Sequence, residues 1–219
     1  DDRLDSRGVS GQLRTDIATY RAEARFLRAL SYWHALDLFR NVPFVTEQDP
    51  VGAFFPKQSS AAELFSFIES ELLAIEPQLA APRSNEYGRA DRAAAWMLLA
   101  KLYINADVYT AQPRYTDCVN YCDKVIAAGF TLEPEYQHLF LADNHRSGEI
   151  IFPIAFDGNN TRTWGGMTFI INAAIGGNIN PTEQGVGGGW GGTRATRQFI
   201  EKFPETEGGL VASPNAGET

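Results

Sequence analysis

The sequence has few cysteines, no excess of basic residues and no long apolar run, and each shortage excludes a class of protein. Two cysteines in 219 residues cannot supply a disulfide framework, and a chain of this length buries enough surface to fold as one domain without one. No apolar run reaches the roughly 20 residues of a membrane-spanning helix. The net charge of −8 and the pI of about 4.9 argue against nucleic-acid binding, which needs a concentrated basic face.

The two cysteines, Cys118 and Cys122, lie four residues apart on a predicted helix. Side chains at this spacing have Cβ atoms ~5–6 Å apart, farther than the ~4 Å that a disulfide needs. Both fall on an apolar stripe, so we expect buried thiols that act as small hydrophobic side chains rather than a redox or metal pair. No histidine or second cysteine pair stands at zinc-finger spacing, and we expect neither a metal nor a cofactor.

The stretch 20–40 has apolar residues on every side when it is wound as a helix that begins near Thr15. Such a helix is typical of the inside of a larger body. Charged and polar side chains are nevertheless scattered along it, and buried charges are tolerated only when they are paired. We therefore expect a central helix tied to its neighbours by embedded ion pairs that involve Glu23, Arg25, Arg28, His34 and Asp37.

Three further helices are predicted from their ends and their periodicity. Ser60 and Glu63 form a capping-box pattern at the start of the first. Apolar residues surround the next helix, 91–108, which is therefore expected to be an inner helix, whereas 115–128 is amphipathic. The helices pair as hairpins that resemble tetratricopeptide (TPR) repeats in their packing rather than in a strict repeat length.

The predicted fold class is mainly α with minor β. TPR-like helical hairpins occupy 13–129, and an irregular, glycine-rich subdomain occupies 130–219. Within that subdomain we expect a strand over 150–156, a short strand or buried run over 168–175, and a final short helix over 194–203. A long irregular segment inside a compact domain is usually functional or disordered, and its tryptophans argue against disorder.

The irregular segment contains the residue types that bind sugars. A flat aromatic ring covers the C–H face of a sugar, and planar amides, carboxylates and guanidinium groups pair with its hydroxyls. The alternative is purely local: Asn-Gly-rich loops turn without any ligand, and a tryptophan in one can simply pack on the core. The ligand-binding candidates are Asp157, Asn159, Asn160, Arg162, Trp164 and Trp190.

Catalysis is the weaker hypothesis, and no catalytic residue is assigned. Glu133 with Glu135, or the pair at 205 and 207, has the composition of a glycosidase pair, but acidic chains produce such doublets freely. His34 and Asp37 are better explained as members of the buried polar set. The sequence has no nucleophile elbow, phosphate-binding loop or dinucleotide fingerprint.

Two composite motifs resemble the SusD/RagB family of nutrient-binding outer-membrane lipoproteins of Bacteroidetes. Residues 23–47 read EARFLRALSYWHALDLFRNVPFVTE, and residues 147–152 read SGEIIF after a predicted hairpin and short helix. The resemblance resumes at 189–194, GWGGTR. Where the family usually has glycine before Val-Pro, this chain has Arg40-Asn41, and Asn tolerates the left-handed conformation that ends a helix there.

The resemblance implies that residues 1–219 are one partial SusD-like domain from the middle of a longer protein. It also implies a lipid anchor on an N-terminus outside this chain, exposure at the cell surface, and a SusC-like TonB-dependent transporter as partner. The implied role is to bind an oligosaccharide and deliver it to that transporter without catalysis.

The runner-up is a TPR-like scaffold that binds peptide or protein, as in RagB-like peptide uptake. An exposed aromatic line beside the Asn-rich loop favours sugars. A groove over the hairpins with open Asn and Arg side chains favours peptides.

Overall fold

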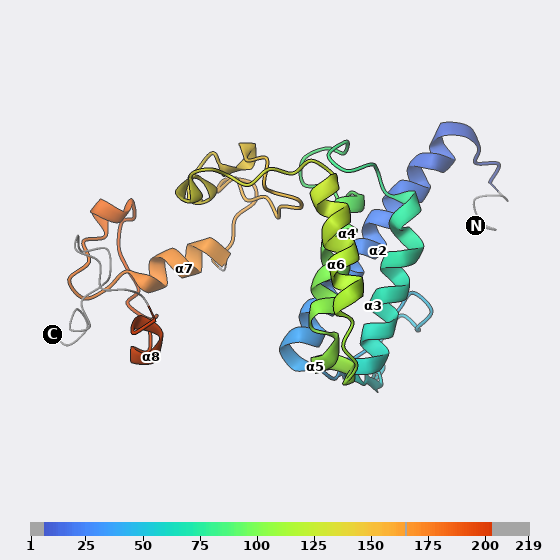
Figure 1. Cartoon of the computed structure of the whole chain (residues 1–219), viewed down its shortest axis with the longest axis horizontal. Coiled ribbons are helices and arrows are strands. Elements are labelled where there is room, and N and C mark those ends of the chain that lie inside the picture. Colours follow the sequence, from blue (N-terminus) through green and yellow to red (C-terminus); the bar gives the residue numbers. More distant parts are fainter. Residues whose placement is uncertain (1–6, 165, 203–219) are drawn as a thin grey trace. The chain divides into compact units, whose positions relative to one another are not determined.

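A computed structural model describes residues 7–164 and 166–202, and Figure 1 shows their helices and strands. The chain forms two compact units, Asp1–Ile154 and Ala155–Thr219. Contacts therefore divide the chain at residue 154, whereas the sequence pattern suggested a boundary near residue 129. The segment 130–154 belongs with the helices of the first unit.

The first unit is mainly helical, as predicted, and its helices pack in two antiparallel pairs. Helix α2 packs against α3, and α4 packs against α6, with the short α5 also contacting α3. None of the described helices is both long and apolar enough to cross a membrane. The bounds are α2 Gly11–Phe39, β1 Val42–Pro43, β2 Gln58–Ser59, α3 Ala61–Ile75, η1 Glu76–Gln78, α4 Arg92–Ile104, α5 Ala106–Thr110, α6 Tyr115–Ala127, η2 Tyr136–Phe140 and η3 Asn144–Arg146.

Local chemistry sets where α3 and α4 begin. The Ser60 hydroxyl accepts the Glu63 N–H, and the Ser60 N–H donates to the Glu63 carboxylate at 2.7 Å, so the predicted capping box is confirmed. Asp91 caps α4 by accepting the Ala94 N–H at 3.1 Å, and its second oxygen accepts the Arg83 N–H at 2.7 Å. Buried Asp91 thus joins the α4 start to the preceding loop.

Helix α4 is the inner helix of the unit, as predicted, but α2 is not enclosed on every side. The buried residues of α2 are Ala22, Phe26, Ala29 and Leu36, on the side where α3 and α4 lie. Tyr20, Leu27 and Leu38, expected inside, are exposed. The expectation of burial all round was wrong because, among the described residues, α2 packs on other helices along one side only.

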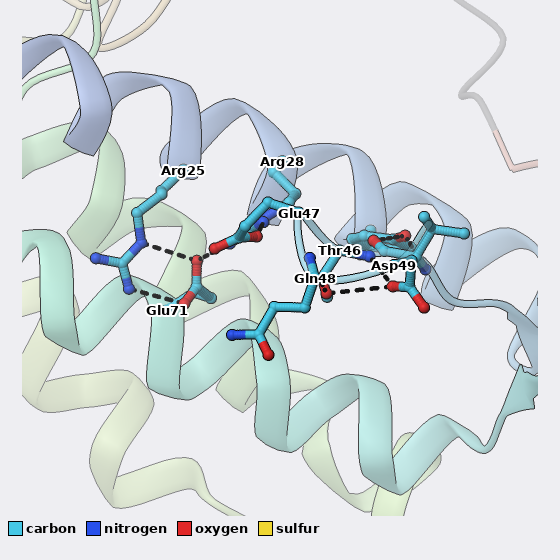
Figure 2. Close-up of polar contacts among 9 residues, drawn as sticks. Arg25, Arg28, Thr46, Glu47, Gln48, Asp49 and Glu71 are labelled. Carbon is cyan, nitrogen blue, oxygen red and sulfur yellow. Dashed lines mark hydrogen bonds and ion pairs between the residues drawn. The ribbon is translucent and has the colours of Figure 1, made fainter. Parts of the chain in front are cut away.

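The predicted ion pairs of α2 are confirmed for Glu23, Arg25 and Arg28, whereas His34 and Asp37, expected among the embedded charges, are exposed. The Arg25 guanidinium forms a two-point contact with Glu71 of α3, at 2.7 and 3.0 Å, and Arg28 donates to the same carboxylate at 2.6 Å (Figure 2). Arg28 also pairs with Glu47 in the loop after β1. The Glu71 side chain is 13% exposed, so two cations are needed to offset its burial.

A second pair fixes the N-terminal half of α2. Glu23 accepts from Arg89 at 2.8 Å and from the Asn85 amide at 2.9 Å, both in the loop before α4. Further along, Asp37 accepts the Tyr109 hydroxyl of α5 at 2.7 Å. Charged side chains of α2 therefore reach α3, α5 and two loops, which is why the helix keeps them despite their cost.

The end of α2 departs from the expectation that Asn41 would turn the chain. Arg40 has φ 64° and ψ −68°, and the Asn41 N–H donates to the Phe39 carbonyl at 2.8 Å, which makes a γ-turn of the rare positive-φ form. Asn41 instead uses its side-chain oxygen to accept the Ala61 N–H at the start of α3. The turn thus connects the ends of two helices that pack together.

Three other sequence predictions needed correction. No strand forms over 150–156, because Ile151 and Phe152 pack on the helical core, where the Phe152 ring meets Phe26 edge-on at 5.1 Å. The run 168–175 is not a strand but most of helix α7, Gly166–Ala174, which is followed by η4, Thr182–Gln184. The final helix is the single turn α8, Arg197–Ile200, capped by Thr196.

Removing the shared carboxylate should destabilise the first unit. We expect Glu71→Gln to lower the free energy of unfolding by about 3 kcal/mol, because Arg25 and Arg28 then lose their buried partner. Glu86→Gln, which removes an exposed carboxylate paired with Arg89, should cost no more than about 1 kcal/mol. Equal losses in chemical denaturation of the two variants would contradict the role given to Glu71.

The same pair predicts a pH dependence. Hydrogen bonding from Arg25 lowers the pKa of Glu71, so its stabilisation is present above the ordinary glutamate pKa and is lost as the pH falls through the lowered, folded-state pKa. Stability should therefore fall in acid less steeply in Glu71→Gln than in the wild type. Denaturant titrations at a series of acidic pH values measure the two slopes, and parallel slopes would be the contrary result.

Candidate ligand-binding site

All six sequence-predicted site residues lie in the second unit, where they form two groups. The first is a tight turn organised by the Asp157 carboxylate. One Asp157 oxygen accepts the backbone N–H of Asn159, Asn160 and Thr161 at 2.7–2.8 Å, and the other accepts the Asn160 amide at 3.1 Å. Gly158 takes φ 76° within this turn, a conformation that suits glycine.

Through these hydrogen bonds the Asp157 carboxylate stabilises the turn 157–161. Its backbone donors, with the Thr161 N–H foremost, lower the pKa of Asp157 to about 2. The carboxylate therefore remains ionised and occupied by the turn. Asn159 and Arg162 are exposed on either side of it, so these side chains, rather than Asp157, are placed to reach a solute.

The second group is aromatic. Trp164, 81% exposed, and Trp190, 46% exposed, lie with ring centroids 6.4 Å apart and planes inclined at 38°. The Phe169 ring of α7 lies 6.0 Å from Trp190. The fold thus brings together two tryptophans separated by 25 intervening residues, and they form one angled, exposed aromatic surface.

Trp190 is held by the backbone around it rather than by burial. Residues 190–193 run past the C-terminal end of α7 and donate to the carbonyls that a helix end leaves without intrahelical partners. The bonds run from the N–H of Trp190 to Asn172 O (2.8 Å), of Gly191 to Ile175 O (2.9 Å), of Gly192 to Ala173 O (3.0 Å) and of Thr193 to Ala173 O (2.9 Å). We call residues 189–193 the strap.

Sequence reasoning missed Phe169. It lay in a run interpreted as a strand or buried segment, and only a helix starting at Gly166 places its ring beside Trp190. Only a prediction of helix over 166–174 could have indicated its position, because the apolar residues around Phe169 do not suggest that its ring is exposed.

Of the residues considered for catalysis, Glu133, His34 and Asp37 are engaged in other contacts, and Glu135 is exposed. The Glu133 carboxylate lies 3.4 Å from both His138 Nδ1 and the Ser147 hydroxyl. Asp37 accepts the Tyr109 hydroxyl, and the His34 ring lies against Trp33. The pair at 205 and 207 falls outside the described residues. Within residues 7–164 and 166–202, no group of three His, Cys, Asp or Glu side chains is arranged to hold a metal ion.

The first unit has its own hollow, of about 430 Å³, lined by residues of α2, α4 and the segment 149–154. Its walls are mostly apolar, and its ionisable groups are His34, Lys101 and Glu149. The Lys101 ammonium lies over the Trp33 ring, 5.4 Å from its centroid. Neither Asn nor Arg is among the described residues that line this hollow.

The sequence and the fold were compared with those of known proteins. No family model matches the chain. It is 38% identical over 200 residues to the starch-binding protein SusD of Bacteroides thetaiotaomicron, covering 89% of this chain and 35% of that protein. A SusD superfamily structure from Parabacteroides distasonis matches with a TM-score of 0.75 and 25% identity, over 92% of this chain and 43% of that one.

A third relative was solved with a ligand. The surface glycan-binding protein A from Bacteroides thetaiotaomicron, in complex with laminarihexaose, matches with a TM-score of 0.67 and 25% identity, over 87% of this chain and 41% of that one. The fold is therefore that of the mainly α proteins built from TPR-like hairpins. Within that class, the chain belongs to the SusD/RagB family. It spans about a third of the length of the curated SusD.

The turn makes a testable prediction about pH. Asp157 has a pKa lowered to about 2, so the turn should stay ordered above the ordinary aspartate pKa and open only as the pH falls through about 2. The backbone amide NMR signals of Asn159, Asn160 and Thr161 should shift together over that range. Asp157→Ala should move all three signals at neutral pH, while Asn159→Ala should leave the signal of Thr161 close to its wild-type position. Independent titration of the three amides would refute a shared carboxylate.

Proposed function

We propose that this protein binds an oligosaccharide outside the cell and passes it, without catalysis, to a SusC-like TonB-dependent transporter in the outer membrane. The chain would act as part of a longer protein, held at the surface by a lipid anchor outside these residues. The observation that carries the proposal is the exposed pair of tryptophans in the second unit.

The geometry of that pair suits a sugar chain. Large indole rings left in solvent are costly unless a partner covers them, and sugar C–H faces are such partners. The two planes are inclined at 38°, so consecutive sugar rings on them would follow a bend rather than a straight line. The exposed Asn159 and Arg162 supply planar hydrogen-bonding groups in the same unit.

The relatives support the ligand class. The curated relative is named a starch-binding protein, and one structural relative was solved with laminarihexaose. Both ligands are glucans, although of different linkage. The class of ligand proposed here is therefore an oligosaccharide.

The peptide alternative has less support. It calls for a groove over the hairpins with open Asn and Arg side chains. One hollow of the helical unit is lined mostly by apolar residues with His34, Lys101 and Glu149, and another, of about 250 Å³, is lined by Arg21, Ala24, Arg25, Arg28 and Glu47. Arg25 and Arg28 of α2 are engaged with Glu71.

The test is a glycan-array screen of the full-length protein followed by calorimetry with the best ligand. We call the exposed aromatic surface of Trp164, Trp190 and Phe169 the sugar platform. Trp164→Ala should weaken binding about ten-fold or more, because this platform then loses one of its exposed aromatic rings. Phe55→Ala is the matched control, since Phe55 is a fully exposed aromatic residue of the first unit, and it should leave affinity unchanged.

Two results would overturn the proposal. Unchanged affinity in Trp164→Ala would remove that residue from the site. Binding of peptides with no glycan bound at all would replace the proposed ligand class with the peptide alternative.

A further inference from the structure

The strap approaches α7 so closely that two of its contacts have no room for a side chain. A Cβ atom on Gly189 would lie 2.2 Å from the carbonyl oxygen of Ile175 and 2.7 Å from its carbonyl carbon. A Cβ on Gly176 would lie 2.7 Å from the Cα of Gly191. All three neighbours are backbone atoms, so no change of rotamer relieves the overlap.

The requirement at these two glycines is one of space, not of backbone conformation. Neither Gly176 nor Gly189 has a positive φ. Gly187 and Gly188, immediately before the strap, have no atom within 4 Å of a Cβ position and no positive φ either. Of the three consecutive glycines 187–189, only Gly189 lies against the end of α7, so Gly187 and Gly188 have space for a side chain and Gly189 does not.

This close approach determines where the Trp190 indole lies. The Trp190 N–H bonds the Asn172 carbonyl, one residue after the Gly189 contact, and the ring then meets Phe169, which is on the same helix. If the strap moved away from Ile175, these carbonyls would lose their donors and Trp190 would leave its position 6.4 Å from Trp164.

We propose that Gly176 and Gly189 are positioning residues of the sugar platform: by admitting the strap against the C-terminal end of α7, they set the angle and distance between Trp190 and Trp164. This inference rests on the proposed glycan-binding function. It adds the residues that decide the shape of the platform, and hence which bend of a sugar chain it accepts.

The experiment compares Gly189→Ala with Gly188→Ala in the full-length protein. Two indoles this close couple their electronic transitions and produce a circular dichroism couplet, which is defined by subtracting the spectrum of Trp164→Phe. Gly189→Ala should lose the couplet and bind the best array glycan about ten-fold more weakly. Gly188→Ala should retain both.

Separate measurements distinguish displacement of the strap from unfolding. Backbone amide NMR signals of α3 and α4 report the first unit, and the amide signals of the Asp157 turn report the second unit away from the strap. Both should be unchanged in Gly189→Ala. Gly176→Ala, whose overlap is milder, is the second variant and should show the same direction of change.

The outcomes separate this inference from the function on which it rests. A couplet retained in Gly189→Ala, or one lost without loss of affinity, overturns the positioning role even if the wild type binds glycan. If Gly189→Ala and Gly176→Ala each lose the Asp157 turn signals together with the couplet, the positioning role is also overturned, because the effect is then general unfolding. If the wild type binds no glycan, the proposed function fails, and loss of the couplet in Gly189→Ala alone still supports the strap as the element that orients Trp190.

Discussion

The contact between two arginines of α2 and one carboxylate of α3 is the constraint on which the helical unit depends. The Glu71 side chain is only 13% exposed, and an ionised group with so little access to water needs close partners, which Arg25 and Arg28 supply by donating to it. Because the two arginines are three residues apart on one helix, the shared carboxylate sets both the rotation and the register of α2 against α3. Arg28 extends the same network to Glu47, and so to the loop that follows β1.

The second unit is organised by a different kind of interaction. Its aromatic residues are largely exposed, and what orders them is backbone hydrogen bonding: the Asp157 turn on one side and the strap across the end of α7 on the other. Such an arrangement leaves indole rings in solvent yet well placed, which is the condition for binding a solute by stacking at little entropic cost. Under the proposed function, the ion pairs that stabilise the helices and the aromatic residues that would contact a glycan therefore belong to separate units of the chain.

Much of this could be read in the residues themselves. Charges set among apolar positions of one helix predicted ion pairs, since a buried charge requires a partner, and the pairs of Glu23, Arg25 and Arg28 confirm it. The Ser60–Glu63 cap needed only four consecutive residues. Composition alone pointed to the loop around Trp164, but the angle between Trp164 and Trp190, and the part taken by Phe169, depend on contacts across many residues.

The sequence by itself determined the features that depend only on nearby residues, namely the helix starts and the enclosed α4. It also determined that embedded charges must be paired, because burying an unpaired charge costs free energy in any fold. Tertiary structure alone decided the rest. The run 150–156 has strand propensity but no partner strand among the described residues, and its Phe152 packs on Phe26 of α2 instead. The exposed side of α2 depends on which elements pack there, and the need for glycine at 189 depends on a carbonyl oxygen fourteen residues earlier. In each of these cases the deciding neighbour is distant in the sequence and is brought close only by folding, so the residues around the position do not reveal it.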